Sequence, residues 1–236
     1  MFEFVNTNKG DFMVLNTEGY WPSFLLSGES DCIPDHIRRT GRWEFDLIES
    51  AQQYIKNDSI VLDIGANIGV WSVYMARNKS LKIHCFEPYV PTYYNLCSNL
   101  LINDALNVTA HRCALSDQSD YGKELPLFVL PSNVGATRLG HTNEAFIESK
   151  FTTNLDYLDR MFPTEVVSFI KIDVEGYEEK VLRGGEQLLL RSKPVIYFES
   201  WNSKQEIQKS LFSYLEGLNY TIQHISSDDY KAIPKE

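Results

Sequence analysis

The sequence is short of basic side chains, of long apolar runs and of any sign of a secretory leader. Lys and Arg number 22 against 32 Asp and Glu, which gives a formal net charge of −10. Because no cluster of Lys and Arg forms a patch that follows phosphates, nucleic acid is an unexpected partner. No apolar stretch approaches a membrane span, and the first residues lack a basic region followed by an apolar core. We therefore expect a cytoplasmic protein without a membrane span.

Cysteine is scarce, and its spacing excludes the usual paired sites. The four cysteines form no C-x-x-C pair, and Cys85 and Cys113 fall in predicted strands. We expect reduced core thiols rather than disulfides or metal ligands. At 236 residues with 43% hydrophobic side chains, the chain is long enough for one sizeable α/β domain with additions.

The dinucleotide-binding turn is also missing two of its glycines. Residues 59–72 read as an apolar strand that ends near Asp63, a small-residue turn, and a helix. Asn67 and Val70 occupy the second and third glycine positions of G-x-G-x-x-G, and Asp63 would repel a pyrophosphate. An acid at this place suits an ammonium or sulfonium group, directly or through water. The turn therefore predicts S-adenosylmethionine as the cofactor.

A second acid follows the next predicted strand. Leu81–Phe86 reads as that strand, with Glu87 at its end and Pro88 as its terminator. An acid at the tip of the neighbouring strand can accept hydrogen bonds from both ribose hydroxyls of a nucleoside. We therefore predict that Glu87 binds the cofactor ribose.

Strands and helices alternate through most of the chain, which indicates a parallel sheet with its ligand at the carboxyl ends of the strands. Residues 1–43 are expected to be irregular and to form a cap or lid over a domain at 44–236. The alternation breaks at 117–152, where two extended pieces flank a predicted turn at 131–137 and suggest a hairpin-like insertion. The predicted elements are a helix at 43–55, a helix from Pro91 to Leu101, a strand at 107–115, a helix at 155–162, a strand at 166–172, a helix broken at Gly184 and Gly185, a strand at 194–199, a helix at 207–218, and a strand at 220–225 paired with 230–233.

With these motifs in view, the chain resembles the FkbM-type family of S-adenosylmethionine-dependent methyltransferases over roughly residues 44–225. The most specific part is the stretch Ile170-Lys171-Ile172-Asp173-Val174-Glu175-Gly176-Tyr177-Glu178 with Val181-Leu182-Arg183-Gly184. The supporting motifs are at 61–69, 86–88, 114–117 and 154–156.

The resemblance implies a Rossmann-like α/β fold whose seven-stranded sheet is mostly parallel, with an antiparallel last strand and helices on both faces. It also implies methyl transfer to an oxygen of a small molecule or sugar. Residues 1–43 have no counterpart in it and, with the insertion, are expected to set the acceptor. In related enzymes the matching positions hold the methionyl, ribose and adenine parts, so the predicted cofactor contacts are Asp63, Gly65, Ala66, Asn67, Gly69, Glu87, Pro88, Ala114, Leu115, Ser116 and Asp173.

Methyl transfer to an alcohol needs a base within hydrogen-bond reach, because the hydroxyl is a poor nucleophile until its proton leaves. Asp173 and Glu175 follow a strand at the ligand edge and are candidates, with cofactor placement the favoured role for Asp173 and a helix-starting role the alternative for Glu175. His141, in the insertion, is a third candidate because its unperturbed pKa lies near neutrality.

Glu199 and Trp201 follow the fifth predicted strand and are the candidate acceptor contacts. Trp201 could stack on a sugar face or simply fill the core. Asp173 with Glu175 alone is thin support for a metal site, so we expect no obligatory metal. The alternatives to an O-methyltransferase acting on a sugar, glycolipid or natural product are a non-catalytic interaction protein with this fold and a nicotinamide-dependent oxidoreductase.

Overall fold

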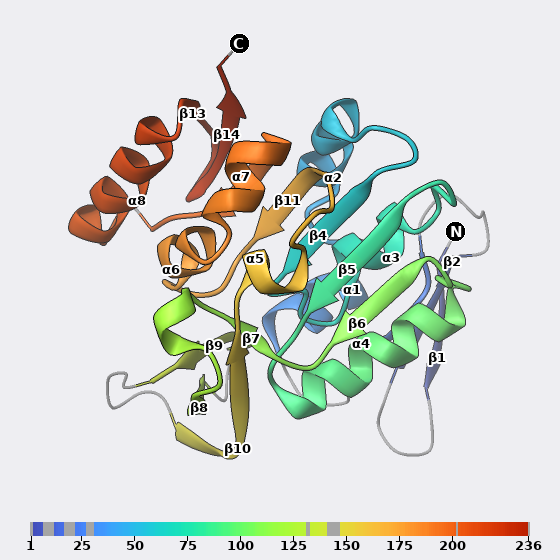
Figure 1. The fold of residues 1–236 in the computed structure, drawn as a ribbon. Helices are drawn as coiled ribbons and strands as arrows, with labels where there is room; N and C mark the ends of the chain where they lie inside the picture. Colours follow the sequence, from blue (N-terminus) through green and yellow to red (C-terminus); the bar gives the residue numbers. More distant parts are fainter. Residues whose placement is uncertain are drawn as a thin grey trace.

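A seven-stranded sheet organises the computed structural model, which describes residues 2–6, 12–16, 22–26, 31–130, 133–140, 147–201 and 203–235 (Figure 1). The strand order is β13-β14-β12-β11-β4-β5-β6. The strands are β4 (Ile60–Ile64), β5 (Lys82–Phe86), β6 (Val108–His111), β11 (Val167–Ile172), β12 (Val195–Glu199), β13 (Tyr220–Ser226) and β14 (Asp229–Pro234).

The direction of the strands follows the prediction. β4 pairs in parallel with β5 and β11, and β6 and β12 continue the parallel sheet on either side. β14, the last strand of the chain, runs antiparallel to both of its neighbours. The mostly parallel sheet with an antiparallel last strand is therefore confirmed. Its central strands are continuous apolar runs because both of their faces are covered.

Helices cover both faces of this sheet, and each face has its own core. One core joins Val61 and Phe169 to α1 (Cys32–Thr40), α2 (Phe45–Ala51), α3 (Val70–Met75) and α4 (Val90–Ile102). The other joins Leu62 and Ile170 to α5 (Leu158–Met161), α6 (Glu178–Arg183), α7 (Glu186–Ser192) and α8 (Gln205–Gly217). Short 3-10 turns η1 (Gln52–Tyr54) and η2 (Gln118–Asp120) complete the helical segments.

The two extended pieces predicted in the insertion are strands that pair antiparallel, as in a hairpin, but they belong to a second sheet with two further strands. Its strands are β7 (Ala114–Leu115), β8 (Glu124–Leu130), β9 (Asn133–Leu139) and β10 (Ile147–Asp156), in the order β7-β10-β8-β9. In Figure 1 these strands lie below the central sheet, toward the edge at which β5 and β11 end. The predicted turn at 131–137 is wrong for most of its length, because residues 133–139 pair antiparallel with the open edge of β8.

Two neighbouring predictions are wrong because the insertion sheet uses residues that the sequence assigned to other elements. The strand predicted at 107–115 is two strands in two sheets, since the chain leaves the central sheet after β6 and pairs β7 with β10. Cys113 lies between them, outside any strand. The helix predicted at 155–162 begins only at Leu158, because Leu155 and Asp156 are used by β10 to pair with β7.

The amino-terminal segment contains regular structure, so the prediction of an irregular segment is wrong. β1 (Phe2–Asn6), β2 (Phe12–Asn16) and β3 (Phe24–Leu26) form an antiparallel sheet, followed by α1. Asn99 Oδ1 of α4 accepts a 2.7 Å hydrogen bond from the backbone N–H of Leu25, which joins β3 to the main domain. A role for this segment as a lid stays a prediction.

Within the described ranges, no helix combines the length and apolar character needed to cross a membrane. The four cysteines are free thiols, and Cys85 is the fully buried one.

Candidate active site

A cavity of about 280 Å³ lies where the central sheet ends and the insertion sheet begins. The loops after β4, β5, β11 and β12 form one side of it, and α1 with β8 and β9 forms the other. This is the edge at which a parallel α/β sheet binds its ligands. The predicted residues that line it are Gly65, Ala66, Asn67, Glu87, Pro88, Ala114, Leu115, Asp173, Glu175 and Glu199.

The two glycines of the first turn are required by contacts within the protein. Gly65 has a φ of +77°, and a Cβ added there would lie 1.7 Å from the backbone oxygen of Asp173. Gly69 has a φ of +88°, and a Cβ added there would lie 2.4 Å from Leu96 Cδ1. These glycines let other parts of the chain, rather than a ligand, approach the turn. Gly65 also lines the cavity, whereas Gly69 does not.

Asp63 lies deeper than the sequence suggests. Its side chain is 0% exposed, does not line the cavity, and accepts a 2.6 Å hydrogen bond from Ser72 Oγ. Burial raises its pKa, while the nearby Lys171 ammonium acts in the opposite direction. The predicted contact of Asp63 with a sulfonium or ammonium group stays a prediction.

Glu87 lies at the end of β5 and faces the cavity. Its two carboxylate oxygens accept hydrogen bonds from the backbone N–H groups of Asn67, at 3.0 Å, and Tyr89, at 2.8 Å. Burial raises the pKa of Glu87 to about 7, although these two hydrogen bonds favour the charged form. The carboxylate is therefore fixed in place, with acceptor capacity left for two ligand hydroxyls.

The segment after β6 forms another wall of the cavity. Ala114 and Leu115 line it, together with the thiol of Cys113, whose pKa is raised by burial to about 12. Ser116 does not line the cavity; it is 0% exposed and donates a 2.8 Å hydrogen bond to Asp120 Oδ2. An apolar wall beside Glu87 is what the flat face of a nucleobase would need.

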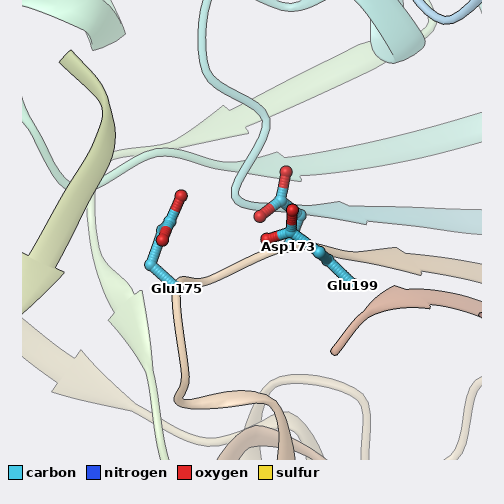
Figure 2. A group of neighbouring side chains, drawn as sticks. All are labelled: Asp173, Glu175 and Glu199. Atoms are coloured by element: carbon cyan, nitrogen blue, oxygen red, sulfur yellow. The ribbon is translucent and has the colours of Figure 1, made fainter. Parts of the chain in front are cut away.

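Three carboxylates gather at a different part of the cavity (Figure 2). Asp173 and Glu175 follow β11, and Glu199 ends β12, its parallel neighbour. Each contributes one oxygen to a set in which all three lie within 4.8 Å of one another. Figure 2 shows the carboxylates of Asp173 and Glu199 next to each other, with Glu175 to one side.

This crowding changes how readily the acids ionise. Burial and the neighbouring Asp173 raise the pKa of Glu175 to about 7. Burial, Asp173 and Glu175 raise the pKa of Glu199 to about 9. The protonated form of Glu199 is therefore favoured at neutral pH, whereas Glu175 has a pKa close to neutrality, as a general base requires.

Two cationic side chains that the sequence analysis missed lie against these acids. The Lys171 ammonium donates to the carbonyl oxygen of Gly65 at 3.1 Å and lies 3.5 Å from Asp173 Oδ2. Arg138 Nη2 of β9 lies 3.5 Å from Glu175 Oε2. These two cations offset part of the negative charge of the three acids. Our expectation that no metal is required stays a prediction. Lys171 could have been found from the sequence, because a lysine inside an otherwise apolar strand needs an acidic partner. Nothing in the sequence around Arg138 predicted its place in the site.

Lys171 stays charged despite its burial. Burial alone would lower the pKa of its ammonium, but the carboxylates of Asp173, Asp63 and Glu44 outweigh that effect and raise it. Glu44, also missed, lines the cavity and accepts a 2.6 Å hydrogen bond from Trp71 Nε1. The buried ammonium thus joins the turn after β4 to the acids after β11.

Trp201 and His141 are the remaining predicted residues. Trp201 does not line the main cavity; its Nε1 donates to Glu199 Oε2 at 3.1 Å, and its ring lies under the Arg138 guanidinium at 4.5 Å. His141 lies outside the described residues, so its predicted role as a base stays a prediction.

Comparison with known proteins shows what this chain is similar to. Residues 63–224 match the family model of the methyltransferase FkbM domain. Methyltransferase sdnD of Sordaria araneosa is 29% identical over 181 residues, which cover 62% of this chain and 68% of that protein. Methyltransferase 1 of Beauveria bassiana is 28% identical over 151 residues, which cover 54% of this chain and 59% of that protein.

Two solved structures share the fold. The FkbM methyltransferase of Methylobacillus flagellatus superposes with a TM-score of 0.53 and 18% identity, over 77% of this chain and 45% of that one. SMU.1697c of Streptococcus mutans, solved in complex with SAH, superposes with a TM-score of 0.51 and 11% identity, over 81% of this chain and 96% of that one. The chain thus spans less than half of the Methylobacillus protein, and at these identities the superpositions establish the fold alone.

Proposed function

Because this chain belongs to the FkbM methyltransferase family, matched over residues 63–224, we propose that it transfers a methyl group from S-adenosylmethionine to a hydroxyl oxygen of a small molecule. The acceptor is a sugar, a glycolipid or another hydroxylated natural product. Membership of the family confirms the resemblance seen in the sequence, and the cofactor, the acceptor and the roles of single residues are the proposal.

The observation that carries the proposal is that one cavity has a fixed carboxylate in one region and a group of three carboxyls in another. Glu87, at the end of β5, would accept the ribose hydroxyls, and Leu115 would pack on the adenine. When bound, S-adenosylmethionine would supply an electrophilic methyl group attached to sulfur.

The three carboxyls supply the proton chemistry in this proposal. Glu175, with a pKa of about 7, would accept the proton of the acceptor hydroxyl. Glu199, with a pKa of about 9, is protonated at neutral pH and donates a hydrogen bond that orients the acceptor. Asp173, beside the Lys171 ammonium, has the favoured role of holding the cofactor. These roles divide binding from proton transfer within one site.

In this proposal the acceptor side of the cavity comes from α1 and from the insertion sheet. Ile33 of α1 and Val134, Thr137 and Leu139 of β9 line it opposite the strand ends. This mixture of apolar and hydroxyl side chains suits a ligand with both apolar and hydroxylated surfaces. The acidic overall charge disfavours a nucleic acid acceptor.

The first test is calorimetric titration of the purified chain with S-adenosylmethionine, S-adenosylhomocysteine and a nicotinamide dinucleotide. We expect the first two to bind and the third not to bind. Binding of the nicotinamide dinucleotide alone would indicate an oxidoreductase, and failure of all three in a folded sample would favour a non-catalytic protein with this fold.

The second test is an acceptor screen with S-adenosylmethionine labelled in its methyl group. Sugars, glycolipids and hydroxylated natural products are offered, and labelled products are examined by mass spectrometry and NMR. A methyl ether supports the proposal, whereas a product methylated on nitrogen or carbon contradicts O-methyl transfer.

A further inference from the structure

An arginine of the insertion sheet reaches the group of acids that ends β11 and β12. Arg138 Nη2 lies 3.5 Å from Glu175 Oε2, and the two side chains are 23% and 15% exposed. Arg138 belongs to β9 and Glu175 to the loop after β11, so the contact joins two different sheets. It is a direct ion-pair contact between the insertion and the proposed base.

The backbone of Glu175 already restricts where its side chain can point. Glu175 has a φ of +59°, in the left-handed region, and Gly176 follows with a φ of +103°. A non-glycine residue is held in this conformation only when its surroundings require it. The turn therefore aims the side chain, and Arg138 holds the carboxylate at the far end.

Trp201 in turn holds Arg138. The Arg138 guanidinium carbon lies 4.5 Å from the centroid of the Trp201 ring, and Lys204 Nζ lies 3.9 Å from the same centroid. A flat guanidinium can stack on an indole and still donate in its own plane to a carboxylate. A lysine at position 138 would keep the charge but would lose this geometry.

We propose that Arg138 is a positioning residue through which the insertion sheet fixes the Glu175 carboxylate beside the acceptor, with Trp201 as the surface that orients its guanidinium. The inference rests on the proposed function of Glu175 as the base. It gives the insertion a direct part in proton transfer, beyond lining the acceptor side. It also gives Trp201 a role in the site without contact to the acceptor.

The charges around Glu175 set what removal of Arg138 should do. Asp173, in the loop after β11, and Glu178 of α6 face Glu175 and disfavour its ionisation. Glu199 of β12 also faces it but is uncharged in the range where Glu175 titrates, because its own pKa is about 9. Arg138 from β9 and Lys204 at the start of α8 act in the opposite direction. Loss of Arg138 leaves burial and the charges of Asp173 and Glu178 opposed mainly by Lys204, so Glu175 should ionise only at higher pH.

The test is an NMR titration of protein labelled with ¹³C at the glutamate carboxyls. The Glu175 signal is assigned by its absence in Glu175→Gln. In the unmodified chain we expect its midpoint near the pKa of about 7. In Arg138→Met the midpoint should rise by about 1–2 pH units, and in Arg138→Lys by less, because the charge is retained.

Arg160→Met is the matched control. Arg160 also pairs with a carboxylate, Asp156, and its guanidinium also lies over a ring, 5.0 Å from Tyr121, but it does not line the cavity. This variant should leave the Glu175 midpoint unchanged. An unchanged midpoint in a folded Arg138→Met would overturn the inference, and so would an equal shift in Arg160→Met.

The Trp201 indole N–H resonance, assigned with Trp201→Phe, provides a second readout. It should move in both Arg138→Met and Arg138→Lys, since neither side chain stacks flat on the ring. An unmoved resonance in both variants would overturn the role of Trp201. Binding of S-adenosylhomocysteine should be retained in both variants, so failure of the unmodified chain to bind it would reject the proposed function separately.

Discussion

Gly65 and Asp173 approach each other so closely that no side chain fits between them. A Cβ on Gly65 would lie 1.7 Å from the Asp173 backbone oxygen and 2.8 Å from its carbonyl carbon. The Asp173 N–H also donates a 2.9 Å hydrogen bond to the carbonyl oxygen of Ile64, so the two strand ends are tied together. The turn after β4 and the loop after β11 therefore form a single unit of the site.

Gly65→Ala should lower the free energy of unfolding by more than about 3 kcal/mol, because the clash is with backbone that cannot move aside. Gly122→Ala is the control, since Gly122 has the same φ of +77° but nothing within 4 Å of an added Cβ. It should cost only about 1 kcal/mol, the penalty for the left-handed conformation. Urea unfolding of both variants measures the difference, and equal losses would show that the Asp173 contact is unimportant.

Glu87→Gln should weaken binding of S-adenosylhomocysteine by about 1–3 kcal/mol, because an amide accepts the ribose hydroxyls less well than a carboxylate. Since Glu87 has a pKa of about 7, affinity in the unmodified chain should be greatest above that pH and fall below it. The fall should be smaller in Glu87→Gln. Calorimetry at pH 6 and pH 8 checks both points, and unchanged affinity in the folded variant would remove Glu87 from the site.

Replacement of Glu175 should separate stability from activity. Glu175→Gly and Glu175→Ala should both reduce methyl transfer by about 10²–10⁴-fold, because the base is lost. The glycine variant should be the more stable of the two by about 1 kcal/mol, since the φ of +59° suits glycine and strains alanine. Urea unfolding measures the change in stability. The rate of methyl transfer to an acceptor identified in the screen measures the change in activity. Equal stabilities would mean that the turn carries no backbone strain.

His111 should make the fold less stable in mild acid. Its ring lies against His84, with Nε2 3.0 Å from His84 Nδ1, and burial together with His84 lowers its pKa to about 4. The unfolded chain therefore takes up a proton at higher pH than the folded chain does. The stabilisation is complete above about pH 6.5 and is lost as the pH falls toward about 4.

Between pH 7.5 and pH 5 this titration should cost about 1–2 kcal/mol of unfolding free energy. His111→Gln should reduce that loss, whereas replacement of the exposed His224 by Gln should leave it intact. Urea unfolding at the two pH values is the measurement. A loss that is identical in the unmodified chain and His111→Gln would assign the acid sensitivity to other groups.

Most of the central sheet and much of the site could be predicted because their signals are local. Apolar runs bounded by acids, glycine or proline mark β4, β5, β11 and β12, and chain alternation makes these strands parallel. Parallel neighbours end at the same edge, so acids at those ends, such as Glu87 and Glu199, were expected to lie along it. These features follow from the sequence alone.

The contacts between segments far apart in the chain could not be predicted from the sequence. Residues 133–139 carry turn-forming types, yet they become β9 because the edge of β8 is available for pairing. Arg138 then meets Glu175 across two sheets, and Lys171 meets the carbonyl of Gly65 across two strand ends. No periodicity or motif encodes such meetings, because they depend on how separately formed elements pack. Local signals were therefore enough to predict the central sheet and its ligand edge, whereas packing placed the charges that face one another there.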